Sequence, residues 1–162
     1  MIHQVKTAIV ESIAELYDRM FSLDADAVSA DTSPEESDLI SETRLSGATE
    51  GTVSIRFPRS TARRLRALAT GAEEDPSDAD LIDLVNELTE MIVAGMRGRL
   101  GPAVVSASRP TVRFGLPRTH DAAGPQHDRW TMASDCGGID IDAAIRSAPS
   151  LRFGNNQNRA AA

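Results

Sequence analysis

The sequence predicts an α/β domain of the α+β type, in which a largely antiparallel sheet is covered by two long helices. Apolar residues recur every three or four positions over residues 2–21 and 77–100, which is the spacing of amphipathic helices. Apolar and polar residues alternate over 51–57, as in a half-buried strand. Strand-like segments follow one another along the chain, and such runs favour antiparallel pairing with helices on one face.

Length and composition indicate one folded domain with an aliphatic core. The chain has 162 residues, which suits a single domain, and we expect that domain to span residues 1–146. Hydrophobic residues make up 41% of the chain but aromatic residues only 4%, so aliphatic side chains must build the core. Residues 147–162 are polar and weakly patterned, and we expect them to form a flexible tail.

The net charge limits the kinds of partner that we expect, and the cysteine content indicates the cellular compartment. With 24 acidic and 17 basic residues the formal charge is −7, so the chain would repel nucleic acid and gain nothing from an anionic membrane. The single Cys136 cannot form an intramolecular disulfide, which fits a reducing compartment. Glu11, Glu15 and Asp18 interrupt the N-terminal apolar residues, where a signal peptide needs a continuous run. We therefore expect a cytoplasmic protein that binds a protein or a small ligand.

The N-terminal third should hold a helix followed by strands. The helix over 2–21 carries an apolar stripe, made of Ile9, Ile13, Leu16, Tyr17 and Met20. Residues 24–30 and 39–46 are strand candidates on either side of a polar loop. The strand at 51–57 ends at Pro58, which cannot donate to a ladder.

Two further helices are predicted in the middle of the chain. The shorter covers 60–70 and ends at Gly71. The longer covers 77–100, where Ser77 and Asp80 resemble a capping box. Its predicted buried face consists of Leu81, Leu84, Val85, Leu88, Ile92 and Met96. Its opposite face carries Asp83, Asn86, Glu87, Glu90, Ala94 and Arg97.

The last third is predicted to return to strands. The candidates are residues 103–108, 111–114, 129–134 and 138–145. Pro110 separates the first two, and a polar loop is expected over 117–128.

Several common sites have no sequence support. The chain has no glycine-rich phosphate loop, and the spacing of His3, His120, His127 and Cys136 matches no standard zinc pattern. We expect surface histidines and no bound metal. No base is identifiable beside Cys136 to make it a nucleophile. The basic run of Arg59, Arg63, Arg64 and Arg66 favours a solvated face over a docking site for an acidic protein.

The polar face of the helix at 77–100 is the best candidate for a working surface. Glu87 and Glu90 stand three residues apart, so their side chains are neighbours, and like charges at this spacing slightly destabilise a helix. Solvated acidic residues are common on helix exteriors, so spacing alone leaves both a functional and a purely solvated role open.

Three segments resemble one family. They are LSG at 45–47 with GTVSIRF at 51–57, DLVNELTEMIVAG at 83–95, and SRPTVRFG at 108–115. In this order they are similar to the glycine-bracketed strands, the central helix and the Ser-x-Pro-Thr-Val segment of the CheX-like chemotaxis phosphatases, relatives of CheC and FliY. The resemblance covers about residues 3–145 at the level of organisation.

The resemblance implies a partner and an activity. Members of the family dephosphorylate the aspartyl phosphate of response-regulator receiver domains such as CheY, using a Glu-x-x-Asn pair on the central helix. The glutamate holds the helix against the receiver, and the amide orients the attacking water. The Mg²⁺ ion belongs to the receiver, so no cofactor is expected in this chain.

The resemblance also assigns roles to individual residues. Glu87 matches the family glutamate and would be the anchor, whereas Glu90 stands at the asparagine position and would handle water or contact the receiver. Asn86, four residues from Glu90, is its alternative as the amide.

We further expect Asp83, Ala94 and Arg97 to contact the partner. Two other roles stay open: a non-catalytic receiver-binding module, favoured by Glu90, and a structural role in which sheet edges pair in a homodimer.

Overall fold

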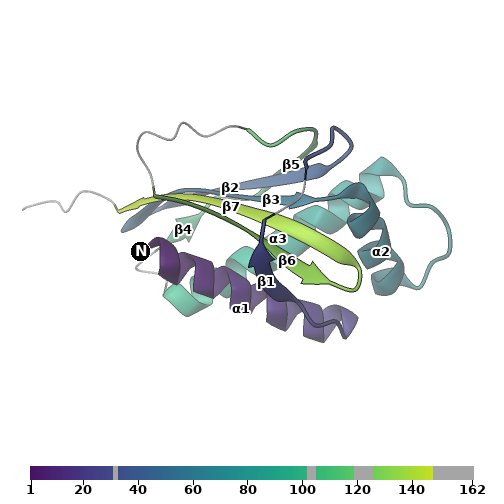
Figure 1. Cartoon of the computed structure of the whole chain (residues 1–162), viewed down its shortest axis with the longest axis horizontal. Coiled ribbons are helices and arrows are strands. Elements are labelled where there is room, and N and C mark those ends of the chain that lie inside the picture. The colour runs from purple at the N-terminus through teal and green to yellow at the C-terminus, as the bar shows by residue number, and fades with distance from the viewer. Residues whose placement is uncertain (31–32, 102–104, 119–125, 148–162) are drawn as a thin grey trace, which may run out of the picture.

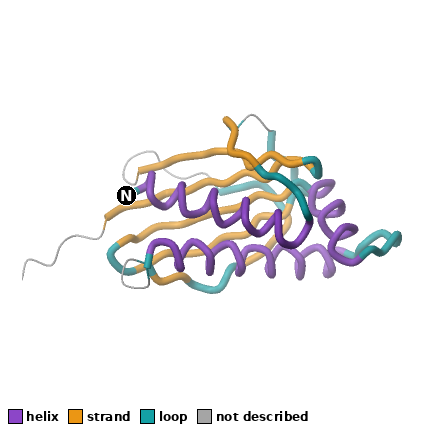
Figure 2. Tube along the Cα trace, turned by 90° about the horizontal axis from the view of Figure 1, so that it is seen from below, coloured by secondary structure: helices purple, strands orange, loops and turns teal. Residues whose placement is uncertain are grey.

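The computed structural model describes residues 1–30, 33–101, 105–118 and 126–147, which form a seven-stranded sheet and three helices (Figure 1). In chain order the elements are α1 (Ile2–Phe21), β1 (Asp26–Ser29), β2 (Leu39–Ser46), β3 (Thr49–Phe57), α2 (Arg59–Thr70), α3 (Asp78–Leu100), β4 (Ser106–Ala107), β5 (Thr111–Phe114), β6 (Gln126–Ser134) and β7 (Gly137–Ser147). Helices α1 and α3 lie side by side across one face of the sheet (Figure 2). The predicted fold class is confirmed.

The sheet is antiparallel throughout. Its strand order is β1-β6-β7-β3-β2-β4, and β5 pairs with β2 beside β4. In the central register Ile55 lies opposite Ser41 on one side and Ile141 on the other. Because side chains alternate along each strand, every second residue faces the helices and the others face away.

The core lies between the sheet and the two long helices. The buried side chains of α3 include all the predicted ones: Leu81, Leu84, Val85, Leu88, Ile92 and Met96. The strands contribute Val53, Ile55, Phe57 and Ile141 to the same cluster. Burial of each such aliphatic side chain contributes about 1.5–3 kcal/mol, so this face of α3 cannot turn outward.

The start of α3 is fixed by the predicted capping box. Ser77 Oγ accepts a hydrogen bond from the Asp80 backbone N–H at 3.2 Å, and the Asp80 carboxylate accepts one from the Ser77 N–H at 3.0 Å. The bonds from Ser77 lower the pKa of Asp80 below its usual value. The box satisfies N–H groups that a helix start otherwise leaves unpaired.

Helix α3 is held on α1 by close backbone approach and by one arginine. A Cβ at Gly95 would lie 2.8 Å from Ser12 Oγ, so a larger residue here would push against the Ser12 side chain. Arg99 forms ion pairs with Glu11 at 3.3 Å and with Glu15 at 2.5 Å. The hydrogen bond from Arg99 lowers the pKa of Glu15. These contacts set the rotation of α3 about its own axis.

The basic run on α2 is partly neutralised by the start of α3. Arg59 pairs with Asp78, and Arg66 lies 3.4 Å from Asp80. Arg63 and Arg64 remain exposed. Two of the four arginines, Arg59 and Arg66, therefore connect α2 to α3, whereas the other two face solvent as predicted.

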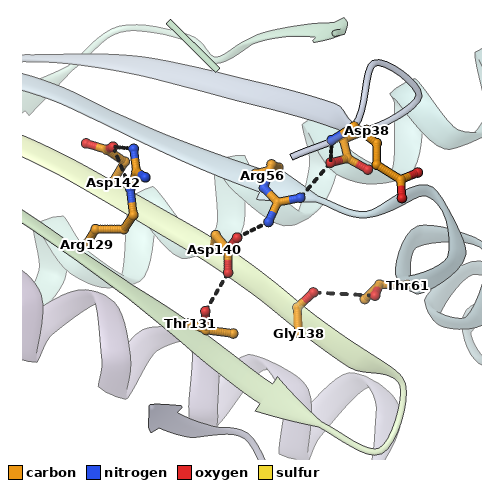
Figure 3. Close-up of polar contacts among 9 residues, drawn as sticks. Asp38, Arg56, Thr61, Arg129, Thr131, Gly138, Asp140 and Asp142 are labelled. Carbon is orange, nitrogen blue, oxygen red and sulfur yellow. Dashed lines mark hydrogen bonds and ion pairs between the residues drawn. The ribbon is translucent and has the colours of Figure 1, made fainter. Parts of the chain in front are cut away.

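The sheet face opposite the helices holds a buried ionic network (Figure 3). Arg56 of β3 donates to Asp38 at 2.6 Å and also pairs with Asp140 of β7, which accepts from the Thr131 hydroxyl. Burial opposes the charge on Arg56, but the hydrogen bonds to its two carboxylate partners outweigh it and raise the pKa. The network connects β2, β3, β7 and β6 on the side that no helix covers.

A second ionic cluster continues this network along β6 and β7. The Asp142 carboxylate accepts from Arg129 Nη2 at 2.8 Å (Figure 3). It also lies 2.5 Å from His127 Nε2. The sequence showed Asp140 and Asp142 only as the polar half of an alternating strand. Their partners lie on other strands, so spacing along the chain could not identify the cluster.

Several predicted boundaries were wrong. The loop expected over 117–128 ends earlier, because β6 begins at Gln126, which pairs with Ile145 of β7. Of the strand expected at 103–108, only Ser106–Ala107 pairs with β2, and residues 102–104 lie outside the described ranges. Strand β7 runs to Ser147, and the remainder of the predicted tail, 148–162, is likewise outside them.

We predict that Gly51→Ala destabilises the fold, because a Cβ at Gly51 would overlap the carbonyl oxygen of Ala144 on β7. Overpacking against backbone should lower the free energy of unfolding by about 2–3 kcal/mol. Urea denaturation followed by circular dichroism measures it. Gly98→Ala is the control, since nothing lies near a Cβ there and helix propensity should raise stability by about 1 kcal/mol. Equal effects of the two variants would contradict the close approach.

We also predict that Arg56→Met costs about 3–5 kcal/mol of unfolding free energy, because Asp38 and Asp140 would stay buried without their cation. Arg129→Met is the matched control, since the Arg129 side chain is 52% exposed and its pair should contribute about 1 kcal/mol or less. Thermal unfolding of both variants at neutral pH gives the comparison. A small loss for Arg56→Met would mean that the network contributes little to stability.

Candidate functional site

The outer face of α3 presents the predicted site residues to solvent. Asp83, Glu87, Glu90, Ala94 and Arg97 are exposed. Asn86 is half-buried at the flank of the helix. This arrangement follows from the fold, because the opposite side of the helix is committed to the core and to α1.

Glu87 and Glu90, like Asp83 on the same helix, are acidic residues without a counter-charge in the described part of the chain. Neither has an ion pair or a hydrogen bond with another residue in the described part of the chain. Glu11 and Glu15 on α1, by contrast, are both paired with Arg99. Two adjacent carboxylates without a counter-charge cost stability, so they are available to a cation on another molecule.

A groove of about 420 Å³ runs beside this acidic pair. One wall is α3, through Glu90, Ala94 and Arg97, and the other is the link between β4 and β5, through Ser108, Arg109 and Pro110. Two segments of the family resemblance, 83–95 and 108–115, therefore meet in space. Spacing along the chain did not predict this contact, because a loop and the short strand β4 separate the two segments.

The far wall of the groove is anchored to the sheet. The backbone N–H of Ser108 donates to the Arg44 carbonyl at 2.9 Å, and the Arg44 N–H donates to Ser108 Oγ at 3.0 Å. Both walls are thus held by regular structure, which gives the groove a defined width.

A second cavity, of about 290 Å³, lies over the ionic network on the other face of the sheet. Its lining includes Arg56, Arg129, Asp140 and Asp142. Every one of these side chains is already held in an ion pair. These ion pairs connect the strands β3, β6 and β7 that line the cavity.

Metal and cysteine chemistry find no support in the structure. Among residues 1–30, 33–101, 105–118 and 126–147, no three His, Cys, Asp or Glu side chains are grouped to hold a metal ion. His120 lies outside these ranges. Burial raises the pKa of the Cys136 thiol, whereas a nucleophilic cysteine needs a lowered one. None of the described helices is long and apolar enough to cross a membrane.

Solved structures match the fold over most of its length. A CheC-like superfamily protein from Shewanella sp. PV-4 has a TM-score of 0.74 at 20% identity, covering 89% of this chain and 98% of that one. The chemotaxis protein CheX from Vibrio vulnificus gives 0.72 at 20% identity, with 88% and 96% covered. CheX of Borrelia burgdorferi, crystallised with CheY, BeF₃ and Mg²⁺, gives 0.64 at 14% identity, with 88% and 97% covered.

Sequence comparison gives the family directly. No curated protein matches the chain at the level of sequence. Residues 40–128, however, match the family model described as chemotaxis phosphatase CheX. That match spans more than half of the chain and includes both walls of the groove, α3 and the link between β4 and β5. The chain therefore belongs to the CheX chemotaxis phosphatase family, as its sequence predicted.

Proposed function

We propose that this chain docks on a phosphorylated CheY-like receiver domain through the outer face of α3 and promotes hydrolysis of its aspartyl phosphate. The observation that carries the proposal is the pair of exposed carboxylates, Glu87 and Glu90, that have no partner within the described residues. Membership of the CheX family and the crystal complex of a homologue with CheY support it. The expected cytoplasmic location is part of the same proposal.

Glu87 would anchor the helix by pairing with a cation near the receiver's phosphorylation site. A rigid helix delivers such a side chain with little loss of entropy. The capping box at Ser77 and the packing of Gly95 against Ser12 provide that rigidity. Asp83, Ala94 and Arg97, on the same exposed face, would complete the contact.

Glu90 would act on the attacking water. A carboxamide at this position could orient water without adding charge, whereas a carboxylate is repelled by the phosphoryl group. A carboxylate can instead accept a proton from the water as the oxygen attacks phosphorus. The Mg²⁺ ion held by the receiver would offset part of the repulsion.

Asn86 is the alternative source of an amide. It lies four residues before Glu90 and therefore on the same side of α3. Its half-buried side chain has less reach than the exposed Glu90, which favours Glu90 as the residue nearest the phosphorus.

A non-catalytic receiver-binding module is the second candidate, and the charge of Glu90 favours it. In that case α3 docks in the same way, but no water is activated. Pairing of the edge strands β1 and β4 in a homodimer is compatible with either function, because both edges have unpaired backbone groups available.

Phosphate release from receivers tests the proposal. The CheY-like receivers of the source organism, phosphorylated by a small phosphodonor with Mg²⁺, should lose phosphate faster with the wild-type chain. Glu87→Ala and Glu90→Ala should each lower the rate about tenfold or more, because they remove the anchor and the proton acceptor. Glu73→Ala, an exposed acid in the α2–α3 connector, should change nothing. Binding without faster release would support the module, and no binding would rule out both functions.

Replacing the carboxylate tests the role of position 90. Glu90→Asn should raise the maximal rate of phosphate release about tenfold, because the amide holds the water without repelling the phosphoryl group. Glu90→Gln is the control for side-chain length, and we expect a smaller gain from it. Stopped-flow or radiolabel release at saturating receiver gives the rates. No gain from either variant would show that Glu90 does not stand at the water-orienting position.

A further inference from the structure

The groove beside Glu90 contains two arginines without a counter-charge. Arg97 and Arg109 face this groove from opposite walls, and neither forms an ion pair with any residue that the structure describes. The chain as a whole carries a formal charge of −7, and Glu90 is the one acidic side chain among the described residues that line the groove. The groove is therefore locally cationic on an acidic molecule, which points to an anionic occupant.

Helix α3 fixes how far Arg97 lies from the acidic pair. Arg97 follows Glu90 by seven residues on α3, which corresponds to about 10 Å along the helix axis. Ala94 lies between them, and its small side chain leaves the groove open. Arg109 comes from the link that Ser108 and Arg44 anchor to the sheet. Arg97 and the acidic pair are thus held at a rigid spacing along α3, and Arg109 is held on the opposite wall.

We propose that Arg97 and Arg109 form a cationic clamp that binds carboxylates on the receiver surface, with Arg97 about 10 Å along α3 from the residue that would meet the phosphoryl group. The inference rests on the proposed function, because it takes the receiver as the partner. Guanidinium groups suit this task, since each can bind a carboxylate through two parallel hydrogen bonds.

The separation of charge implies one docking orientation. Acidic residues occupy the part of α3 around Glu87 and Glu90, and basic residues occupy the groove near its C-terminal end. A receiver that offers a cation near its phosphorylation site and carboxylates farther away meets both only in one direction. Reversing the helix would place like charges together, which costs affinity. The clamp would therefore bring Glu90 to the phosphoryl group and select among receivers.

Reversing the charge of Arg97 and Arg109 tests the clamp through the affinity for activated receivers. The dissociation constants of the wild-type chain and of the double variant Arg97→Glu/Arg109→Glu are measured for the source organism's receivers activated with beryllofluoride and Mg²⁺. The double variant should bind at least about tenfold more weakly and lose most of the dependence of affinity on salt concentration. Arg63→Glu/Arg64→Glu is the matched control, with the same change in charge on α2, at the other end of the molecule from β4 (Figure 1). It should change the dissociation constant less than about twofold.

The rate of phosphate release separates the clamp from a role at phosphorus. With the double variant the half-saturating receiver concentration should rise, while the maximal rate stays within about twofold of wild type. A lower maximal rate at unchanged affinity would overturn the clamp, because it would place the arginines on the phosphoryl group. Arg97→Gln/Arg109→Gln, which adds no repulsion, should lie between wild type and the reversed variant.

The outcomes distinguish this inference from the function on which it rests. If the wild type binds an activated receiver and the double variant binds it equally well, the clamp is wrong and the docking function stands. If the wild type binds none of the receivers, the docking function is wrong and the clamp falls with it. Far-ultraviolet circular dichroism of each variant verifies folding, and a folded glutamine variant decides the test if the reversed one unfolds.

Discussion

The packing of one apolar side of α3 against the sheet and α1 is the interaction on which the rest of the structure depends. Leu81, Leu88 and Ile92 are almost completely buried in that contact. Exposing them would cost several kcal/mol by area alone, so the helix has a single rotational setting. Because the rotation of α3 about its axis is fixed, Glu87 and Glu90 on its opposite side face solvent. The candidate site is a consequence of the core.

The charged side chains of this protein fall into two groups, those that are ion-paired within the chain and those that are available to a partner. On the open face of the sheet, Arg56 is buried between Asp38 and Asp140, and the cost of desolvation is met by several hydrogen bonds. On the outer face of α3, Glu87 and Glu90 have no described partner and remain exposed. Groups of the first kind hold strands together. Exposed carboxylates without a described partner, such as Glu87 and Glu90, are available to pair with a cation on another molecule.

The carboxylate of Glu90 would repel a phosphoryl group if α3 docks on a receiver as we propose. An amide can approach a phosphoryl group at no Coulombic cost, but a carboxylate in a site shielded from water cannot. In the proposed complex the cation that would offset it is the receiver's Mg²⁺ ion, whereas Arg97 and Arg109 would bind carboxylates elsewhere on the receiver. In the proposed mechanism proton transfer to Glu90 would replace the positioning of water by a neutral amide.

The sequence by itself determined the elements that depend on local patterns. Helical periodicity gave both long helices, alternation gave the strand at 51–57, and the Ser77–Asp80 spacing gave a capping box that the structure contains. It also gave the outward face of α3, because an amphipathic helix buries its apolar side wherever it packs. The order of three short motifs indicated the family that the comparisons then established.

Only the tertiary structure decided what depends on distant strands. The start of β6 at Gln126 requires the ladder with β7, and the partners of Asp140 and Asp142 come from β3 and β6. The groove joins α3 to the Ser108–Pro110 link through the sheet order, in which β4 and β5 lie beside β2. Local spacing carries no information about such contacts, because register and strand order are set by how all the strands pair at once.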